Sequence, residues 1–266
     1  MTSPPILIHA GFHKTGTSTV QGVLRENKAA LRKLGFPVLL RWKLRPAVDA
    51  ARGYSASADP VGLAKFGDRV HRIVADLPPL ERRGLIVSAE ELSGHLPGRD
   101  GIVDYRAAVP LVQEIVAAFG ARYGAERLRF VYTTRARDTW IDSAYWEHVK
   151  AGAMTDDLEA FRNQMSGWGG FPKELDRIAD AVAPVPVTAL ALEATADERL
   201  GPAAPILRLA GLGNDALAGL TAVGRANTRL DAETRAAFLA INRAEPDRDR
   251  RAAAKRALLE KRTSQA

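Results

Sequence analysis

The chain of 266 residues contains no cysteine, which excludes disulfide bonds, zinc sites built on cysteine and a cysteine nucleophile. It also has no apolar run that approaches the ~20 residues needed to span a membrane, so we expect no stable membrane insertion. The first six residues carry no basic side chain and the apolar run there breaks at His9, so we expect no signal peptide. Together these absences predict a cytoplasmic protein. Hydrophobic residues make up 46%, enough to build a folded core.

Acidic residues are in the minority, with 31 Asp and Glu against 38 Lys and Arg, which gives a net charge of +7. The segment 243–266 alone contributes +4 of that charge. A basic protein favours anionic partners such as nucleotides, or sulfated or phosphorylated compounds. A basic nucleic-acid-binding module is one alternative, but no motif for reading or stacking bases accompanies the charge, so we expect no nucleic-acid partner. The charge pattern of the segment 243–266 is typical of a solvent-exposed helix that carries many salt bridges.

Short apolar runs that alternate with helical patterns predict an α/β fold. Strands are expected at 6–9, 36–40, 84–88, 128–132 and 185–192. This alternation favours a three-layer arrangement, a parallel sheet with helices on both faces. The first helix is predicted over 15–34, where Gly35 ends it. We expect a single domain over 1–266, with a helical insertion at 41–77 and a basic helical tail at 243–266. Within the insertion, the mixed composition of 41–62 indicates a loop or a small helical insertion.

The turn after the first strand has the composition of an anion-binding loop. It combines Gly11, Lys14 and Gly16 with three successive hydroxyl residues, 17–19, and it leads directly into a helix. Backbone N–H groups at such a helix start point toward an anion, and the helix dipole favours negative charge. Capping of the helix by one hydroxyl is the simpler interpretation. Capping does not explain a lysine and two glycines in the same turn.

The loop departs from the standard nucleoside-triphosphate motif G-x-x-x-x-G-K-[ST]. Gly11 and Gly16 have the required spacing, but Thr17 stands where that motif has its lysine, and the lysine is three residues earlier at Lys14. No predicted strand ends in the aspartate that would hold Mg²⁺. The pattern therefore favours a phosphate site without a metal over the main alternative, an ATP-dependent P-loop small-molecule kinase. No histidine has a carboxylate partner at ligand spacing, so we predict no metal site.

The string GFHKTGTS at positions 11–18 resembles the 5′-phosphosulfate-binding loop of bacterial P-loop sulfotransferases. These enzymes use 3′-phosphoadenosine 5′-phosphosulfate (PAPS) and release 3′-phosphoadenosine 5′-phosphate (PAP). The resemblance implies a P-loop nucleoside-triphosphate-hydrolase-like fold and transfer of a sulfuryl group to an acceptor. It assigns the cofactor's phosphosulfate to seven consecutive residues: His13, Lys14, Thr15, Gly16, Thr17, Ser18 and Thr19. Among these, Lys14 is the residue that would stabilise charge on the transferring group.

A second sequence element that resembles the same family follows the strand predicted over 128–132. There an arginine at the strand end and a serine eight residues later bind the 3′-phosphate, and Arg135 and Ser143 have that spacing here. A guanidinium presents a charged fork to phosphate oxygens, and a hydroxyl adds a hydrogen bond. The segment 224–230 is similar to the late segment that closes over the cofactor in bacterial members. Arg225 and Arg229 are therefore further candidates for cofactor binding.

The resemblance also bears on the general base and the acceptor. Glu90 follows the strand at 84–88, at a position where a glutamate serves as base in some members, and Glu91, His95 and His13 remain open as alternatives. The acceptor is expected to be a hydroxyl or amine of a carbohydrate, lipid-linked glycan or small molecule. The segments 41–77, 91–105 and 151–171 would form its pocket. The sequence indicates neither the acceptor's identity nor the oligomeric state.

Overall fold

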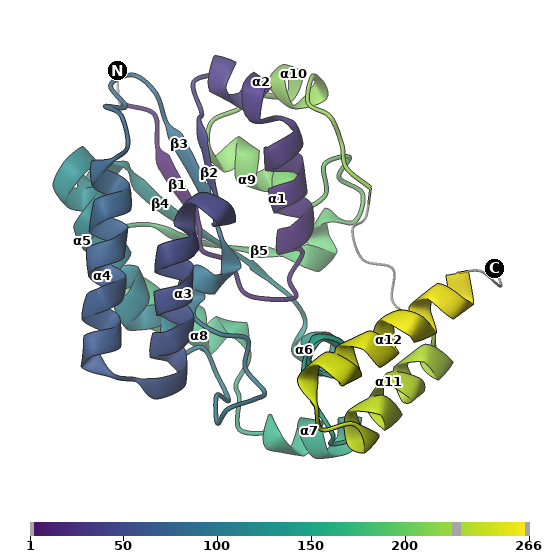
Figure 1. Ribbon diagram of the computed structural model, residues 1–266. Coiled ribbons are helices and arrows are strands. Elements are labelled where there is room, and N and C mark those ends of the chain that lie inside the picture. The colour runs from purple at the N-terminus through teal and green to yellow at the C-terminus, as the bar shows by residue number, and fades with distance from the viewer. Residues whose placement is uncertain (1–2, 225–229, 264–266) are drawn as a thin grey trace.

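The computed structural model describes residues 3–224 and 230–263 of the chain. Its centre is a sheet of five parallel strands in the order β2-β3-β1-β4-β5 (Figure 1). The strands are β1 (Ile6–His9), β2 (Val38–Leu40), β3 (Leu85–Ser88), β4 (Leu128–Thr134) and β5 (Val187–Ala191). In β1 to β3 every residue is buried, as the uninterrupted apolar runs predict. The predicted α/β class with a parallel sheet is confirmed.

The strand order places a topological switch point between β1 and β4. The chain leaves β1 toward β2 on one side of the sheet, and it leaves β4 toward β5 on the other side. In open parallel sheets ligands bind in the crevice outside the carboxyl ends of the strands at such a point. The segments that follow these two strands are the glycine-bearing turn after His9 and the turn that contains Arg135. Topology alone therefore brings the two predicted cofactor elements to one edge.

Helices cover both faces of the sheet (Figure 1). The helices are α1 (Thr17–Glu26), α2 (Lys28–Lys33), α3 (Arg41–Ser57), α4 (Pro60–Ala75), α5 (Ala108–Tyr123), α6 (Arg137–Ala151), α7 (Leu158–Gln164), α8 (Phe171–Val182), α9 (Ala203–Leu209), α10 (Asn214–Ala218), α11 (Ala232–Ala244) and α12 (Arg248–Thr263). Short 3₁₀ turns lie at η1 (Glu90–Ser93), η2 (Ala125–Arg127) and η3 (Leu192–Thr195). One buried cluster joins the sheet to α1 and α9, and a larger one joins the opposite face to α3, α4, α5 and α8. Alternate strand residues divide between the clusters, Leu7 in the first and Ile6 and Ile8 in the second.

One prediction in the amino-terminal half is wrong. The helix predicted over 15–34 is two helices, because Asn27 donates from Nδ2 to the carbonyls of Val23 and Thr221 and ends α1. Of the two interpretations of 41–62, a loop or a small helical insertion, the structure shows the helical one over most of the segment, which forms α3 despite Pro46 inside it. Burial of one face of α3 against α4 and the sheet outweighs the cost of the proline.

The carboxyl-terminal helices α11 and α12 pack beside α6, beyond the carboxyl ends of the strands (Figure 1). Lys255 of α12 is buried and donates from Nζ to the carbonyls of Val149, Lys150 and Gly152 at the end of α6. A cation at a helix carboxyl terminus satisfies carbonyls that have no partner within the helix. The tail is thus helical as predicted and docked on the helix that follows β4. Within the described ranges, none of the helices is both long and apolar enough to cross a membrane.

Candidate active site

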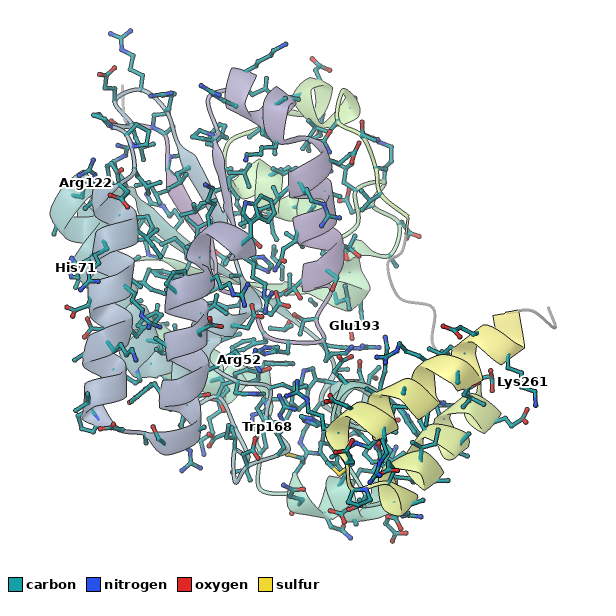
Figure 2. All side chains as sticks on the ribbon, viewed as in Figure 1. Arg52, His71, Arg122, Trp168, Glu193 and Lys261 are labelled. Atoms are coloured by element: carbon teal, nitrogen blue, oxygen red, sulfur yellow. The ribbon has the colours of Figure 1, made fainter. Side chains whose placement is uncertain are left out.

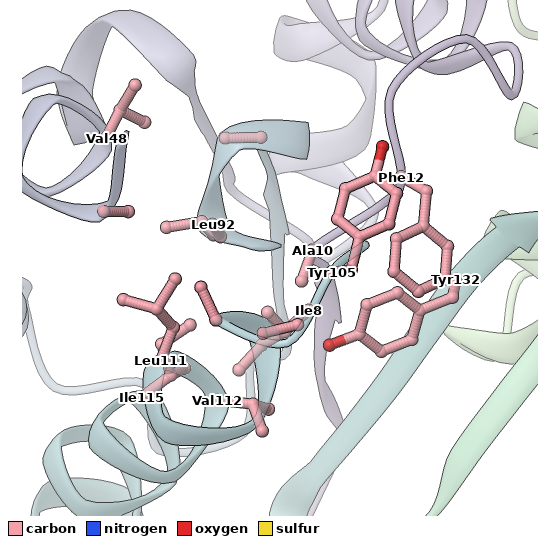
Figure 3. Packing of buried hydrophobic residues seen from close by; sticks show 14 of the residues in the cluster. Ile8, Ala10, Phe12, Val48, Leu92, Tyr105, Leu111, Val112, Ile115 and Tyr132 are labelled. Atoms are coloured by element: carbon pink, nitrogen blue, oxygen red, sulfur yellow. The ribbon is translucent and has the colours of Figure 1, made fainter. Parts of the chain in front are cut away.

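The loop between β1 and α1 is anchored in the core by Phe12. Its side chain is fully buried, and its ring centroid lies 4.6 Å from that of Tyr105 and 4.9 Å from that of Tyr132 (Figure 3). Its ring centroid also lies 4.7 Å from that of Phe171. Such a cluster adds offset and tilted aromatic contacts to the burial of apolar area. The loop is therefore held in one shape by the core beneath it.

A buried chain of hydrogen bonds ties three strand ends to the loop. His9 Nδ1 lies 2.9 Å from Ser88 Oγ and His9 Nε2 lies 3.3 Å from Thr133 Oγ1. Thr133 Oγ1 lies 2.7 Å from Thr15 Oγ1, which donates to the carbonyl of Phe12.

The directions of these bonds follow from the last donor. The hydroxyl of Thr15 donates its one proton to a carbonyl, so it must accept from Thr133. Thr133 in turn accepts from His9. His9 is thus neutral with its proton on Nε2, and Ser88 donates to Nδ1. Burial agrees, because it lowers the pKa of His9 to about 4. The expectation that His9 is structural fits this network.

The backbone of the loop leaves a helix start open to an anion. Among the described residues no side chain caps α1, whose N-cap residue is Gly16, and the first turn carries no acidic residue. Gly16 has φ +94°, and a Cβ there would lie 2.7 Å from a methyl carbon of Leu192. Capping, the simpler interpretation of this sequence, is therefore not what the structure shows. Uncapped amides at the start of a ten-residue helix are suited to bind an anion.

Neighbouring side chains hold the loop carbonyls. Trp140 Nε1 donates to the carbonyl of His13 over 2.7 Å, and Arg135 Nη1 donates to the carbonyl of Lys14 over 3.4 Å. Tyr105 Oη accepts from the backbone N–H of His13. The carbonyls of His13 and Lys14 thus accept from side chains of α6 and of the turn before it. The structure brings Arg135 to the loop, as the order of the two motifs predicts.

Lys14 has a strained backbone and a partner that the sequence did not indicate. Its φ is +64°, in the left-handed region that disfavours residues with a Cβ. Its Nζ lies 2.7 Å from Oε2 of Glu147, and both side chains are partly exposed. Burial would raise the pKa of Glu147, but the hydrogen bond and charge of Lys14 outweigh it and lower that pKa. Glu147 could not be found from the sequence, because no motif marks it and 133 residues separate the pair.

Two carboxylates follow β3 in different surroundings. Glu90 is half-buried and accepts a hydrogen bond of 2.5 Å from Nε2 of Gln21. Burial raises the pKa of Glu90, and the nearby charge of Glu91 raises it further. Glu91 is buried and pairs with Arg41, whose Nε lies 2.5 Å from its Oε1. A carboxyl group with a raised pKa suits proton transfer near neutral pH, so Glu90 fits the role of base better than Glu91 does.

The two histidine alternatives have poor basicity. His13 lies beside Tyr105, with Nδ1 3.3 Å from the phenol oxygen. Burial lowers the pKa of His13 to about 3, and the charges of nearby groups, Arg52 and Lys14 among them, lower it further. His95 accepts at Nε2 from two arginines, and burial with those charges lowers its pKa to about 4. Both rings are neutral near pH 7.

The remaining predicted residues lie on α1 and α6. Thr17 is buried, Ser18 is exposed and Thr19 is half-buried at the start of α1. Ser143 is half-buried within α6. Arg225 and Arg229 lie outside the described residues. Glu193 follows β5 and accepts from the backbone N–H of Ala136 at the start of α6, close to Arg135 in the chain (Figure 2).

The aromatic residues Trp140, Tyr145 and Trp168 are buried, so they pack in the core. Trp146 is partly buried, and the guanidinium of Arg235 lies 4.5 Å from its ring centroid.

Comparisons with protein-family models, with curated proteins and with solved structures found no match to this chain. In residues 3–224 and 230–263 no group of three or more histidine, aspartate or glutamate side chains is arranged to hold a metal ion.

Proposed function

We propose that this protein is a sulfotransferase that moves a sulfuryl group from PAPS to a hydroxyl or amine of an acceptor. The observation that carries the proposal is the loop after β1. It combines three features at the switch point of the sheet: Lys14, an uncapped helix start, and a glycine, Gly16, at a left-handed φ of +94° where a Cβ would lie 2.7 Å from Leu192. The strand order, with β1 central and the loop directly after it, supports a P-loop-like version of the α/β fold.

The loop fits a phosphosulfate in charge. Among the described residues the amides at the start of α1 have no side-chain cap, and Lys14 in the same loop supplies a cation. When bound, PAPS supplies an activated sulfuryl group with PAP as leaving group. Lys14 would stabilise the charge that develops on the leaving oxygen, and Arg135, held against the loop at the carbonyl of Lys14, would contact the nucleotide's 3′-phosphate.

Glu90 would take the acceptor's proton. It lies at the carboxyl end of β3, next to the central strand, and its charge acts on the phenol of Tyr105, which contacts His13 of the loop. Its raised pKa makes it a stronger base than an ordinary carboxylate. Glu147 pairs with Lys14 and would release it toward the incoming phosphosulfate.

Calorimetric titration tests the cofactor, and transfer of radiolabelled sulfate from PAPS to a panel of alcohols and amines tests the reaction. We expect PAP to bind in preference to AMP and to ATP with Mg²⁺. We also expect label to appear on at least one acceptor class, in wild type and in Lys33→Ala, an exposed control on α2. Preference for ATP with Mg²⁺, and no binding of PAP, would favour the kinase alternative and overturn the proposal.

A further inference from the structure

A cluster of basic and imidazole side chains lies beside the loop and takes no part in the proposed cofactor site. It consists of Arg52 of α3 with His95 and Arg99 of the segment after η1. Arg52 Nη2 lies 3.3 Å from His95 Nε2, and Arg99 Nη2 lies 2.7 Å from the same nitrogen. The two guanidinium nitrogens therefore lie no farther apart than about 6 Å, the sum of those two distances. Arg52 is near the middle of the molecule in Figure 2, whereas His71 and Arg122 are at its outer edge.

The hydrogen bonds of the cluster leave it with more donors than acceptors. Guanidinium groups only donate, so His95 Nε2 must accept, and its proton must be on Nδ1. That Nδ1 is buried and has no hydrogen-bond partner among the described residues, and the same holds for Arg99 Nε. Buried donors are nearly always paired in folded proteins. An acceptor at this position would satisfy groups that the protein itself does not.

The charges are also unbalanced. The carboxylates near the cluster are Asp100, which lies 3.9 Å from Arg99 Nε and is largely exposed, and Glu147, which acts on Arg99 through its charge but is bonded to Lys14. Among the described residues Arg52 has no carboxylate within ion-pair distance. Two guanidinium groups whose nitrogens lie within about 6 Å of each other repel each other unless an anion lies near both. A guanidinium pair is also well suited to bind two oxygens of a carboxylate, sulfate or phosphate.

The cluster is held in place from two sides. The backbone N–H of His95 donates to Ser55 Oγ over 2.8 Å, and Ser55 Oγ donates to the carbonyl of Arg52. Gly94 allows this approach, since a Cβ there would lie 2.8 Å from Ser55 Cβ. On the other side, His148 Nε2 donates to the carbonyl of Pro97 over 2.7 Å. The basic groups are thus fixed between α3 and α6, which reduces the entropy lost on binding.

The cluster is close enough to the loop to act on a molecule bound there. Glu147 of α6 is bonded to Lys14 of the loop, and the next residue, His148, donates to the carbonyl of Pro97, two residues before Arg99. The segments that supply the cluster, within 41–77 and 91–105, are those predicted to form the acceptor pocket.

We propose that Arg52, His95 and Arg99 form a subsite for an anionic group carried by the acceptor. The group is a carboxylate, sulfate or phosphate, whose shared feature is a set of oxygens that accept from both guanidinium groups. The acceptor is then an acidic alcohol or amine. This inference rests on the proposed function for the role of the bound molecule as acceptor.

Inorganic sulfate is the probe, and the ring signals of the five histidines in the NMR spectrum are the readout, with the signal of His95 assigned from His95→Gln. Sulfate is titrated at constant ionic strength into wild type saturated with PAP, and into nucleotide-free Lys14→Gly, where the loop lysine is removed. We expect a saturable shift of the His95 signal in both. Arg52→Gln and Arg99→Gln should each weaken sulfate at least tenfold, the size expected for a lost charged hydrogen bond.

The control is Arg45→Gln, because Arg45 lies on the same helix, is exposed and pairs with Asp49. It should leave sulfate affinity within twofold of wild type. A shift that does not saturate, or equal weakening in Arg45→Gln, overturns the subsite. The subsite is also overturned if a folded Arg52→Gln or Arg99→Gln variant binds sulfate with wild-type affinity. If one of the two variants does not fold, the other alone provides this test.

Acceptor preference separates this inference from the proposed function. In matched acceptors with and without a carboxylate, wild type should favour the acidic member in kcat/KM, and Arg52→Gln should lower that preference at least tenfold. If PAP binds and transfer occurs but neutral acceptors are preferred and sulfate does not bind, only the subsite fails. If sulfate binds to the cluster but PAP does not bind, the proposed function fails and the anion site stands.

Discussion

Lys14 Nζ lies 2.7 Å from Glu147 Oε2, so the lysine that we propose acts on the transferring group is paired with a carboxylate of α6. A phosphosulfate bound as proposed would compete with this carboxylate for the same cation. Because both side chains are partly exposed, water and salt screen the interaction, and the competition is worth about 0–1 kcal/mol. The pair would adjust the cofactor affinity without controlling access.

Removing the carboxylate should therefore strengthen nucleotide binding modestly. In Glu147→Gln we expect the Kd of PAP to fall by about two- to fivefold, because Lys14 no longer has a competing anion. Isothermal titration calorimetry measures this change. Asp142→Asn is the matched control, since Asp142 is on the same helix and pairs with Arg162. An unchanged Kd in Glu147→Gln would show that Glu147 does not compete with the nucleotide for Lys14.

Lys14→Gly should separate activity from stability. It removes the cation, which we expect to lower kcat by about 10²- to 10³-fold, the loss typical of one electrostatic donor. Glycine also relieves the left-handed backbone at φ +64°, a gain of about 1 kcal/mol that offsets the lost ion pair. The midpoint of thermal unfolding should stay within about 4 °C of wild type. A folded variant with kcat within twofold of wild type contradicts the role of Lys14.

Arg135 and Ser143 should discriminate between nucleotides. In Arg135→Ala we expect PAP to bind about 10- to 100-fold more weakly, with AMP affected less than about threefold, because only PAP carries the 3′-phosphate. Ser143→Ala should show the same selectivity with a smaller loss. Arg129→Ala is the control, since Arg129 lies toward the amino end of the same strand and donates to the carbonyl of Glu126. Equal losses for both nucleotides would mean that the pair does not contact the 3′-phosphate.

The loop was accessible to sequence reasoning because its residues are consecutive and their geometry is local. The strand before Gly11 and the helix after Gly16 fix where the amides point. Arg135 was found for a related reason, because the carboxyl end of a parallel strand places it at the site edge.

The sequence does not indicate the pairing of Lys14 with Glu147 or the grouping of Arg52 and Arg99 around His95. These contacts depend on how helices far apart in the chain pack. Lys14 and Glu147 are 133 residues apart, and Arg52 and His95 are 43 apart. The wrong helix boundary at Asn27 has the same origin, since its side chain bonds to Thr221, 194 residues away. Local patterns predict elements, whereas these contacts are set by tertiary structure.

Glu90→Gln tests the general base through a pH profile. The variant keeps the shape of the side chain and loses its basicity, so we expect kcat to fall by about 10²- to 10⁴-fold while the Kd of PAP stays within about twofold. In wild type, kcat/KM should decline as the pH falls through the pKa of Glu90. Burial raises that pKa, so the decline should begin above the range of an ordinary carboxyl group. Loss of this limb in Glu90→Gln would identify Glu90 as the titrating base.

The stability of the same variant distinguishes a base from a structural ion-pair partner. Because the folded-state pKa of Glu90 is raised, the folded protein holds this proton more tightly than the unfolded chain does. Its contribution to stability is present at about pH 4, below the unfolded pKa, and is lost as the pH rises through the folded pKa. Glu90→Gln removes that loss, so it should be at least as stable as wild type at about pH 8. Thermal unfolding at both pH values measures the difference. A variant that is less stable than wild type at about pH 8 and has an unchanged pH–rate profile would show that Glu90 stabilises the fold as an anion, and the role of base would pass to another residue.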